Sequence, residues 1–266
     1  MQSEERLESI LWKVRHDGRV YTARLAEEYG VSEETVRRDI RALVRESKVK
    51  RVHGGATCLY PPCSENAYFV RRLRDAEAKR KIGAYASGLI EDGEIIALDG
   101  GCCNEQLVRE LFNKKELIFV TNFIPAVNAL NEKVQQNHIG GRAILLGGEM
   151  NSENLVTYGV LTEEMVEKFR FTRAFISASA LSDSGAMIWN VGEGKIARIM
   201  AEHAANVVLL CESAKFSQTS LYQYIDYSSV DMLVTDDGHD IPSETRTRLE
   251  SDGVEVVILS MESENT

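Results

Sequence analysis

The chain lacks several features that mark whole classes of protein: long apolar runs, paired cysteines, clustered histidines and frequent prolines. No apolar run in its 266 residues approaches the roughly 20 residues that a membrane-spanning helix needs, so we expect no membrane partner. The five cysteines are an odd number, and their spacing matches no zinc site, so we expect no disulfide framework, no metal and no cofactor. The N-terminus mixes acidic with apolar residues, unlike a signal peptide, and reduced thiols suit a cytoplasmic protein.

Positive charge is scarce overall but is concentrated near the N-terminus. The formal net charge is -10, which taken alone disfavours a nucleic-acid-binding protein. Residues 1–57, however, carry 12 basic and 10 acidic side chains, whereas the remainder carries 19 and 31. Residues 41–57 hold five basic side chains and one acidic one, which makes them the strongest candidate for phosphate contact. We therefore expect nucleic acid to be bound through the N-terminal part.

Two short helices joined by a tight turn are predicted in this part. Residues 22–29 repeat apolar side chains at helical spacing, and Gly30 follows them as a helix C-cap. Ser32 is a suitable N-cap for a second helix over residues 33–46, which has two glutamates in its first turn. Such a pair of helices, with arginines exposed near the start of the second, is the geometry that places a recognition helix in the DNA major groove.

The second helix has one apolar face and one basic face. Its apolar side chains recur every three or four positions, which leaves Thr35, Arg37 and Arg38 to reach base edges or flanking phosphates. Asp39 is expected to orient a neighbouring arginine. The alternating run at residues 48–53 is typical of a basic wing along the phosphate backbone. The residues expected to contact DNA are Ser32, Thr35, Arg37, Arg38, Arg41, Lys48, Lys50, Arg51 and His53.

Two motifs in this stretch, TVRRDI at residues 35–40 and RVHGGA at residues 51–56, resemble the DeoR family of bacterial transcription regulators and stand at the family's spacing. The resemblance implies a winged helix-turn-helix domain that binds double-stranded operator DNA, most often in a repressor. Regulators of this kind bind paired half-sites, so we expect a homo-oligomer, a dimer or a tetramer. The family's usual glycine between helix and wing is Ser47 here, which we expect to weaken the helix end modestly.

A segment with adjacent prolines separates this part from the rest of the chain. We predict a DNA-binding domain at residues 1–57, a linker at residues 58–69 and an effector-sensing α/β domain at residues 70–266. A charged helix over residues 71–90 is expected to open the second domain. Its basic cluster is expected on a solvated face; the alternative is that one or two of these cations reach a phosphorylated ligand.

Beyond residue 94, short β-branched runs alternate with helical patterns, which predicts an α/β domain with a mainly parallel sheet covered by helices on both faces. The predicted strands span residues 95–98, 117–121, 143–146, 174–178, 207–211, 232–235 and 254–259. The predicted helices span residues 105–112, 124–131, 162–168, 194–205 and 243–252.

Glycines and polar residues follow several of these strands, at the sheet edge where open α/β sheets bind ligands. Paired glycines allow an anion to approach the backbone, and a following helix N-terminus supplies free N–H groups. We therefore expect a site for a small polyhydroxylated anion. The candidate residues are Asp99, Gly100, Gly101, Cys102, Cys103, Asn104, Thr121, Asn122, Gly147, Gly148, Glu212 and Lys215.

The second half resembles the effector domain of the same family, which is related to ribose-5-phosphate isomerase and CoA-transferase folds. The family's motifs fall on residues 99–103, 120–122, 146–148 and 212–216. The resemblance implies that these residues hold a phosphorylated sugar or a related metabolite. Two threonines of the first motif are Cys102 and Cys103 here, and a thiol is a weaker donor than a hydroxyl. It stays open whether the effector differs from that of the family or has been lost. It also stays open whether the two cysteines form a redox sensor, because a helix N-terminus lowers the pKa of a thiol, or are only small core side chains.

Three classes of function are considered: a metabolite-responsive regulator, an enzyme on the same scaffold, and a ligand-blind architectural DNA binder. An isomerase or transferase needs a general base, for which Asp99, Glu149 or Glu212 are candidates. No histidine lies in the strand-end motifs, however, and a DNA-binding domain has no use in such an enzyme. An architectural protein would show no thermal shift with any metabolite. The sequence therefore favours the regulator.

Overall fold

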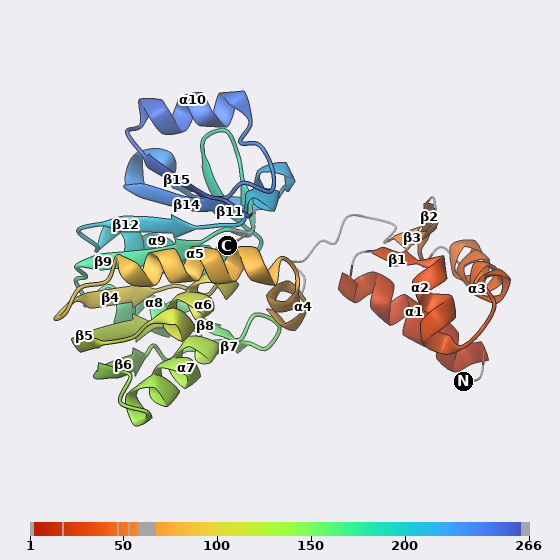
Figure 1. Cartoon of the computed structure of the whole chain (residues 1–266), viewed down its shortest axis with the longest axis horizontal. Coiled ribbons are helices and arrows are strands. Elements are labelled where there is room, and N and C mark those ends of the chain that lie inside the picture. Colours follow the sequence, from red (N-terminus) through yellow and green to blue (C-terminus); the bar gives the residue numbers. More distant parts are fainter. Residues whose placement is uncertain (1–2, 18, 47, 53, 58–67, 262–266) are drawn as a thin grey trace, which may run out of the picture. The chain divides into compact units, whose positions relative to one another are not determined.

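The computed structural model describes residues 3–17, 19–46, 48–52, 54–57 and 68–261, and the chain divides into two compact units (Figure 1). The first unit spans Met1–Arg71 and the second spans Arg72–Thr266. Of the linker predicted at residues 58–69, residues 58–67 lie outside the described residues, and residues 68 and 69 belong to a helix. The predicted domain boundaries stay predictions.

The first unit is a bundle of three helices closed by a small antiparallel sheet. Its elements are α1 (Ser3–Asp17), β1 (Arg19–Tyr21), α2 (Thr22–Tyr29), α3 (Glu33–Arg45), β2 (Lys50–Val52) and β3 (Gly55–Thr57). The strands lie in the order β1-β3-β2, so β1 joins the wing to the bundle. Val36, Ile40 and Leu43 recur at helical spacing on α3 and lie in one buried cluster with Ile10 of α1 and Leu25 of α2.

The predicted turn between α2 and α3 is confirmed. Gly30 adopts φ 64° and ψ 35°, the left-handed conformation that favours glycine at a helix C-cap. Ser32 caps α3, because its Oγ accepts a hydrogen bond from the Thr35 amide at 3.2 Å. α3 ends at Arg45, one residue before the predicted end. Ser47, which was expected to weaken this helix end, lies outside the described residues.

The second unit has the predicted α/β architecture, a parallel sheet between layers of helices (Figure 1). Its seven sheet strands are β4 (Ile95–Leu98), β5 (Lys114–Thr121), β6 (Ile139–Leu145), β9 (Arg173–Ser177), β12 (Val207–Leu210), β14 (Met232–Asp236) and β15 (Glu255–Leu259). Its α-helices are α4 (Tyr68–Leu73), which spans the boundary between the units, α5 (Ala76–Gly88), α6 (Cys102–Glu110), α7 (Ile124–Gln135), α8 (Val160–Val166), α9 (Val191–Glu202) and α10 (Ser243–Ser251). The strand order is β15-β14-β12-β9-β4-β5-β6, and every neighbouring pair is parallel.

Successive side chains of a strand point to opposite faces of the sheet, so these apolar strands form a hydrophobic core on each face. α5, α6 and α7 lie next to one another on one face, and α9 packs with α8 on the other (Figure 1). Ala97, Ile176 and Leu209, from three adjacent strands, share one buried cluster with Ile196 and Met200 of α9. No helix in the described part of the chain is both long and apolar enough to cross a membrane.

The strand order changes direction between β4 and β9. From β4 the chain builds the sheet in one direction through β5 and β6, and it then returns to add β9, β12, β14 and β15 on the other side. α6, which follows β4, and α9, which follows β9, lie on opposite faces of the sheet (Figure 1), and open α/β sheets bind ligands at the carboxyl ends of the strands at such a point. The residues that follow these two strands are therefore in position to form a site.

The helix predicted over residues 71–90 is wrong in one respect, because the structure divides it into α4 and α5. Asp75 between them adopts φ 49°, a left-handed conformation that ends one helix before the next begins. The prediction also missed a hairpin, β7 (Glu149–Asn151) with β8 (Val156–Tyr158). These strands are only three residues long, so they show no sustained alternation.

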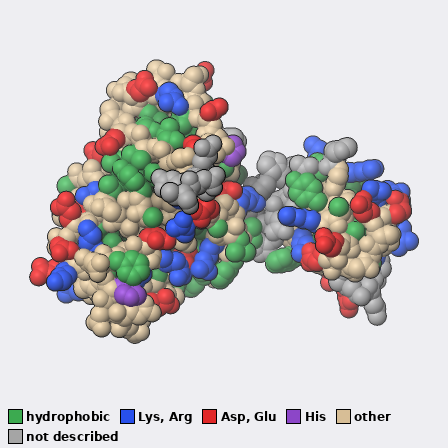
Figure 2. Space-filling model, in the orientation of Figure 1, with side chains coloured by type: hydrophobic (Ala, Val, Ile, Leu, Met, Phe, Trp, Pro, Cys, Tyr) green, Lys and Arg blue, Asp and Glu red, His purple; other side chains and the backbone are tan. Residues whose placement is uncertain are grey.

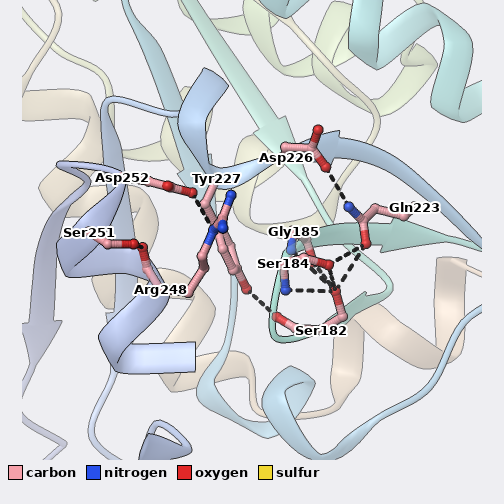
Figure 3. A network of polar contacts seen from close by, with 9 residues as sticks. All are labelled: Ser182, Ser184, Gly185, Gln223, Asp226, Tyr227, Arg248, Ser251 and Asp252. Atoms are coloured by element: carbon pink, nitrogen blue, oxygen red, sulfur yellow. Dashed lines mark hydrogen bonds and ion pairs between the residues drawn. The ribbon is translucent and has the colours of Figure 1, made fainter. Parts of the chain in front are cut away.

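A second small sheet was also missed. It consists of β10 (Ala180–Leu181), β11 (Gly185–Ile188) and β13 (Tyr222–Asp226), followed by the 3₁₀ helix η2 (Tyr227–Ser229). Figure 3 shows the polar contacts that fix its turn. The Ser184 hydroxyl donates to Gln223 Oε1 at 2.8 Å, and the Tyr227 hydroxyl donates to the carbonyl of Ser182 at 2.8 Å. Hydrogen bonds between distant segments hold this sheet together, and sequence patterns do not report them.

Candidate nucleic-acid interface and effector site

α3 presents the predicted recognition residues on its outer face. Arg37 and Arg38 are exposed, whereas Val36, Asp39 and Ile40 are buried against the rest of the bundle. The amphipathic pattern therefore separated the two faces correctly. The exposure that DNA contact requires is present, and the contacts themselves stay a prediction.

Two of the exposed arginines are held by glutamates of the same helix. Arg37 donates to Glu33 at 2.6 Å, and Arg41 donates to Glu34. Arg38 has no hydrogen-bond or ion-pair partner among the residues that the structure describes. Figure 2 shows basic and acidic side chains close together over the first unit. Exposed ion pairs contribute only about 0–1 kcal/mol each, so a DNA phosphate can displace the glutamates.

Asp39 does orient an arginine, but that arginine is Arg6 of α1. Arg6 Nε donates to Asp39 Oδ2 at 2.5 Å, and both side chains are buried. The pair therefore fixes the rotation of α3 about its own axis relative to α1, which directs Arg37 and Arg38 outward.

The wing carries the remaining predicted cations. Lys50 and Arg51 are exposed on β2, and Lys48 pairs with Glu46 at 2.6 Å. Gly55 lies so close to β1 that a Cβ atom there would lie 1.8 Å from a backbone carbonyl oxygen, which explains the need for glycine. His53, also predicted to contact DNA, lies outside the described residues.

Asp99 and Ser177 meet where β4 and β9 end, at the point where the strand order changes direction. Asp99 Oδ2 accepts hydrogen bonds from the Ser177 amide and hydroxyl, both at 3.2 Å. Burial raises the pKa of Asp99 to about 7, although hydrogen bonds from the Gly100 and Ser177 amides oppose the shift, and the negative charge of Glu193 adds to it. Near neutral pH this carboxyl group can therefore either donate or accept a hydrogen bond. Sequence reasoning selected Asp99 and missed Ser177.

Packing alone accounts for the glycine pair that follows Asp99. A Cβ atom on Gly100 would lie 2.4 Å from Val156 Cγ1, and one on Gly101 would lie 2.7 Å from Ser177 Oγ. The loop before α6 is therefore pressed against β8 and the end of β9. Contact between these glycines and an anion stays a prediction.

Gly148 is equally constrained, whereas a Cβ atom on Gly147 would meet only the sulfur atom of Met165, at 3.9 Å. The Gly147 carbonyl accepts a hydrogen bond from the Thr162 hydroxyl at 2.7 Å. Gly148 has φ 151°, and a Cβ atom there would lie 1.9 Å from Thr162 Oγ1. These two residues hold α8 against the loop after β6, and nothing in the structure tests a role in binding.

Three buried amide and hydroxyl side chains tie the strand-end loops together. Thr121 donates to the last carbonyl of β4 at 2.5 Å, Asn122 Nδ2 donates to the carbonyl of Thr157 at 2.9 Å, and Asn104 Nδ2 donates to the carbonyl of Asp99 at 2.8 Å. The Oδ1 atoms of Asn104 and Asn122 are buried without a hydrogen-bond partner in the described structure. Each can accept a hydrogen bond from a ligand or a water molecule.

The two adjacent cysteines at the start of α6 are core side chains. Cys102 and Cys103 are buried, and Cys103 Sγ lies 3.7 Å from Glu212 Oε2. Burial raises the pKa of the Cys103 thiol well above its usual value, and the charge of Glu212 raises it further. The lowered thiol pKa expected of a redox sensor is therefore wrong for Cys103, because burial and the carboxylate outweigh the helix N-terminus.

Glu212 pairs with Lys79 in α5, a residue outside the predicted site. Lys79 Nζ lies 2.5 Å from Glu212 Oε1, and Lys79 is 3% exposed. The solvated basic face predicted for residues 71–90 is therefore wrong for Lys79. Lys215, which was predicted to bind the effector, is half-buried and donates to Gln218 at 3.3 Å. Burial raises the pKa of Glu212, but the charges of Lys215 and Lys79 outweigh this effect and lower it overall.

A further buried carboxylate, whose charge acts on Asp99, was missed. Glu193 in α9 is buried and accepts hydrogen bonds from Asn151 Nδ2 at 2.6 Å and from Asn154 Nδ2 at 3.1 Å. A capping signal in the sequence could have located this helix start, because Asn190 Oδ1 accepts from the Glu193 amide at 3.1 Å. Among the described residues, no group of histidine, cysteine and acidic side chains is arranged to hold a metal ion.

Both units match models of known domains. Residues 6–61 match the DeoR-like helix-turn-helix domain, and residues 74–237 match the DeoR C terminal sensor domain. The HTH-type transcriptional repressor GlcR of Bacillus subtilis is 30% identical over 236 residues, which cover 89% of each chain. The glycerol-3-phosphate regulon repressor of Escherichia coli is 28% identical over 238 residues, which cover 89% of this chain and 92% of the other.

Among solved structures, a ribose 5-phosphate isomerase from Methanocaldococcus jannaschii aligns over 53% of this chain and 54% of its own, with a TM-score of 0.36 and 17% identity. Both of these curated relatives align over most of this chain and are transcription repressors, which confirms the sequence prediction of a regulator over an enzyme. Since the two domain models together account for most of its length, the chain belongs to the DeoR family of helix-turn-helix transcription regulators.

Proposed function

We propose that the protein is a cytoplasmic repressor whose α3 binds an operator in the DNA major groove. The observation that carries this proposal is the exposure of Arg37, Arg38 and Arg41 on a helix whose opposite face fills the core of the first unit. An arginine fork fits the two acceptors of guanine in the major groove. Lys50 and Arg51 on the wing supply phosphate contacts, which position the protein on the duplex.

The operator complex that we propose contains two or more copies of the chain. One recognition helix with three exposed arginines makes few base contacts, so it distinguishes few base pairs. A homo-oligomer, a dimer or a tetramer, binds paired half-sites and multiplies this specificity.

We further propose that the carboxyl ends of β4, β9 and β12 bind a phosphorylated sugar or a related metabolite, which lowers operator affinity. Asp99 and Ser177 meet at this edge of the sheet, and the buried amide oxygens of Asn104 and Asn122 can accept hydrogen bonds from sugar hydroxyls. α6 begins directly after Gly101, so its first N–H groups lie at the same edge and suit an anion. One relative is named for the glycerol-3-phosphate regulon, which supports the same class of metabolite.

Operator selection followed by a ligand screen tests both proposals. The purified full-length protein first selects duplexes from a random pool. We expect one enriched sequence with two half-sites, and a pool without enrichment would contradict sequence-specific binding. Thermal melting is then measured with a panel of phosphorylated sugars, alone and with the selected duplex. We expect at least one compound to raise the melting temperature of the protein and to release the duplex. A panel that changes neither would favour a regulator that has lost its effector.

A further inference from the structure

Lys79 is a buried cation at the edge of the sheet where the effector is proposed to bind. It lies in the first turn of α5, and its ammonium group contacts Glu212 just beyond the end of β12. Burial lowers the pKa of Lys79, but the charge of Glu212 and the hydrogen bond to it raise the pKa overall. Lys79 therefore stays charged. It is a cation next to the start of α6, where Cys103 contacts the same carboxylate.

The same ammonium group also holds the joint between α4 and α5. Lys79 Nζ donates to the carbonyl of Arg74, and the Lys79 amide donates to the carbonyl of Asp75 at 3.1 Å. Asp75 has φ 49°, a conformation that residues other than glycine rarely adopt, so surrounding contacts have to stabilise it. On the N-terminal side of the joint, the chain continues through α4 to residues 58–67 and then to the DNA-binding unit.

A second ion pair connects α4 to the same edge of the sheet. Arg72 Nε lies 3.5 Å from Oε2 of Glu105, whose side chain is 1% exposed and also accepts from Arg109 at 2.8 Å. Glu105 belongs to α6, which begins directly after Gly101. Two cations at the start of the second unit, Arg72 and Lys79, are thus bound to residues in or beside the predicted effector loops.

We propose that Lys79 is an effector-binding residue and that the anionic group of the effector replaces Glu212 as its partner, which releases the joint between α4 and α5. This inference rests on the proposed function of the strand ends as the effector site. The exchange does not leave Glu212 unpaired, because Lys215 also stabilises its charge. The buried thiols at the start of α6 are weak hydrogen-bond donors. The charged ammonium group of Lys79 is therefore a stronger partner than these thiols for a phosphate bound next to the start of α6.

Hydrogen–deuterium exchange of the backbone amides of residues 72–79, measured on the full-length protein, tests the release of the joint. Glu212→Gln removes the charged partner of Lys79 without changing the shape of the side chain. We expect it to speed exchange in this segment and to lower affinity for the selected operator, each by about tenfold, in the absence of any ligand. Glucose 6-phosphate, the probe, should produce the same two changes in the wild type.

The assignment of Lys79 is tested by removing its charge. Lys79→Met alone leaves Glu212 with one fewer cation in a buried place and can unfold the domain, so the Lys79→Met/Glu212→Gln double variant carries the test. We expect glucose 6-phosphate and inorganic phosphate to leave its melting temperature unchanged. Arg80→Met is the matched control, because Arg80 is the next residue of α5, is half exposed and pairs with Glu77 at 2.8 Å. It should respond to the probes as the wild type does.

The possible results separate this inference from the proposed function. A double variant that keeps the wild-type thermal shift overturns the assignment of Lys79 and leaves the effector site in place. Unchanged exchange at residues 72–79 in Glu212→Gln overturns the release of the joint. If no phosphorylated sugar shifts the wild type, the phosphorylated effector is contradicted, and exchange in Glu212→Gln still decides whether the ion pair holds the joint.

Discussion

Arg6 of α1 and Asp39 of α3 form a buried ion pair with two hydrogen bonds, at 2.5 Å and 3.3 Å, across the interface that positions the recognition helix. Removing one member of such a pair leaves an uncompensated charge in the core. Asp39→Ala should therefore destabilise the first unit by about 3 kcal/mol, which hydrogen exchange of the α3 amides would report as a rate increase of roughly 150-fold.

A double variant distinguishes a lost pair from lost packing. Arg6→Met/Asp39→Leu removes both charges, so it should recover most of the stability that Asp39→Ala loses. Lys13→Met is the control for a less buried pair: the Lys13 side chain is 22% exposed and pairs at 2.9 Å with Glu28, which is 51% exposed, so the change should cost less than about 1 kcal/mol. Equal effects of Asp39→Ala and Lys13→Met would show that burial of the Arg6–Asp39 pair has no energetic consequence.

Base recognition and phosphate contact should respond differently to mutation. Arg38→Ala should weaken binding to the selected operator by about 1–3 kcal/mol and leave binding to a scrambled duplex nearly unchanged, because the lost contact is to a base edge. Lys50→Ala should weaken both duplexes equally, because its contact is to phosphate. Fluorescence anisotropy with matched and scrambled duplexes measures both effects. The same specificity ratio in the two variants would contradict this division of roles.

Asp99 makes the stability of the second unit depend on pH. Its pKa is about 7 in the folded protein and about 4 in an unfolded chain. Between these two pH values the folded state therefore binds more protons than the unfolded state. The stability that this proton binding contributes is lost as the pH rises through the pKa of the folded state. Relative to Asp99→Asn, the wild type should lose up to about 3 kcal/mol of unfolding free energy between pH 5 and pH 8. Parallel pH profiles from urea denaturation would contradict the raised pKa.

Gly148 should tolerate no side chain whether or not a ligand binds. Its φ of 151° and the short approach to Thr162 Oγ1 predict that Gly148→Ala lowers the unfolding free energy, by about 2–3 kcal/mol. Adding Thr162→Ala removes the clashing hydroxyl and should restore part of that loss. Gly88→Ala is the control, because a Cβ atom there meets nothing within 4 Å. Thermal melting of the three variants measures the difference, and no loss in Gly148→Ala would rule out the packing constraint.

Local patterns predicted most of the fold. Strand β4 matches its predicted span of residues 95–98, and the cap at Ser32 and the turn at Gly30 were predicted from their own side chains. Alternating strand and helix signals also fixed the parallel sheet, because crossover connections between parallel strands leave few topologies.

The missing parts of the candidate site depend on partners far apart in the sequence. Lys79 was assigned to the solvated basic face of residues 71–90, because the sequence does not show that the fold places Glu212 beside it. Asp99 was selected from the loop after β4, whereas Ser177, its hydrogen-bond donor, is the last residue of β9, and no glycine follows this strand to mark a site. Asp39 was expected to orient a neighbouring arginine, but helical periodicity does not show that its partner is Arg6 of another helix.

Arg37 pairs with Glu33, and Arg41 pairs with Glu34. These pairs affect the number of phosphate contacts that is deduced from the salt dependence of DNA binding. Added salt releases the protein from phosphate through counter-ion competition. It also screens the internal pairs that the same arginines have to break before they bind, which favours the complex. The two effects partly cancel, so the slope of log affinity against log salt will indicate fewer phosphate contacts than the complex makes.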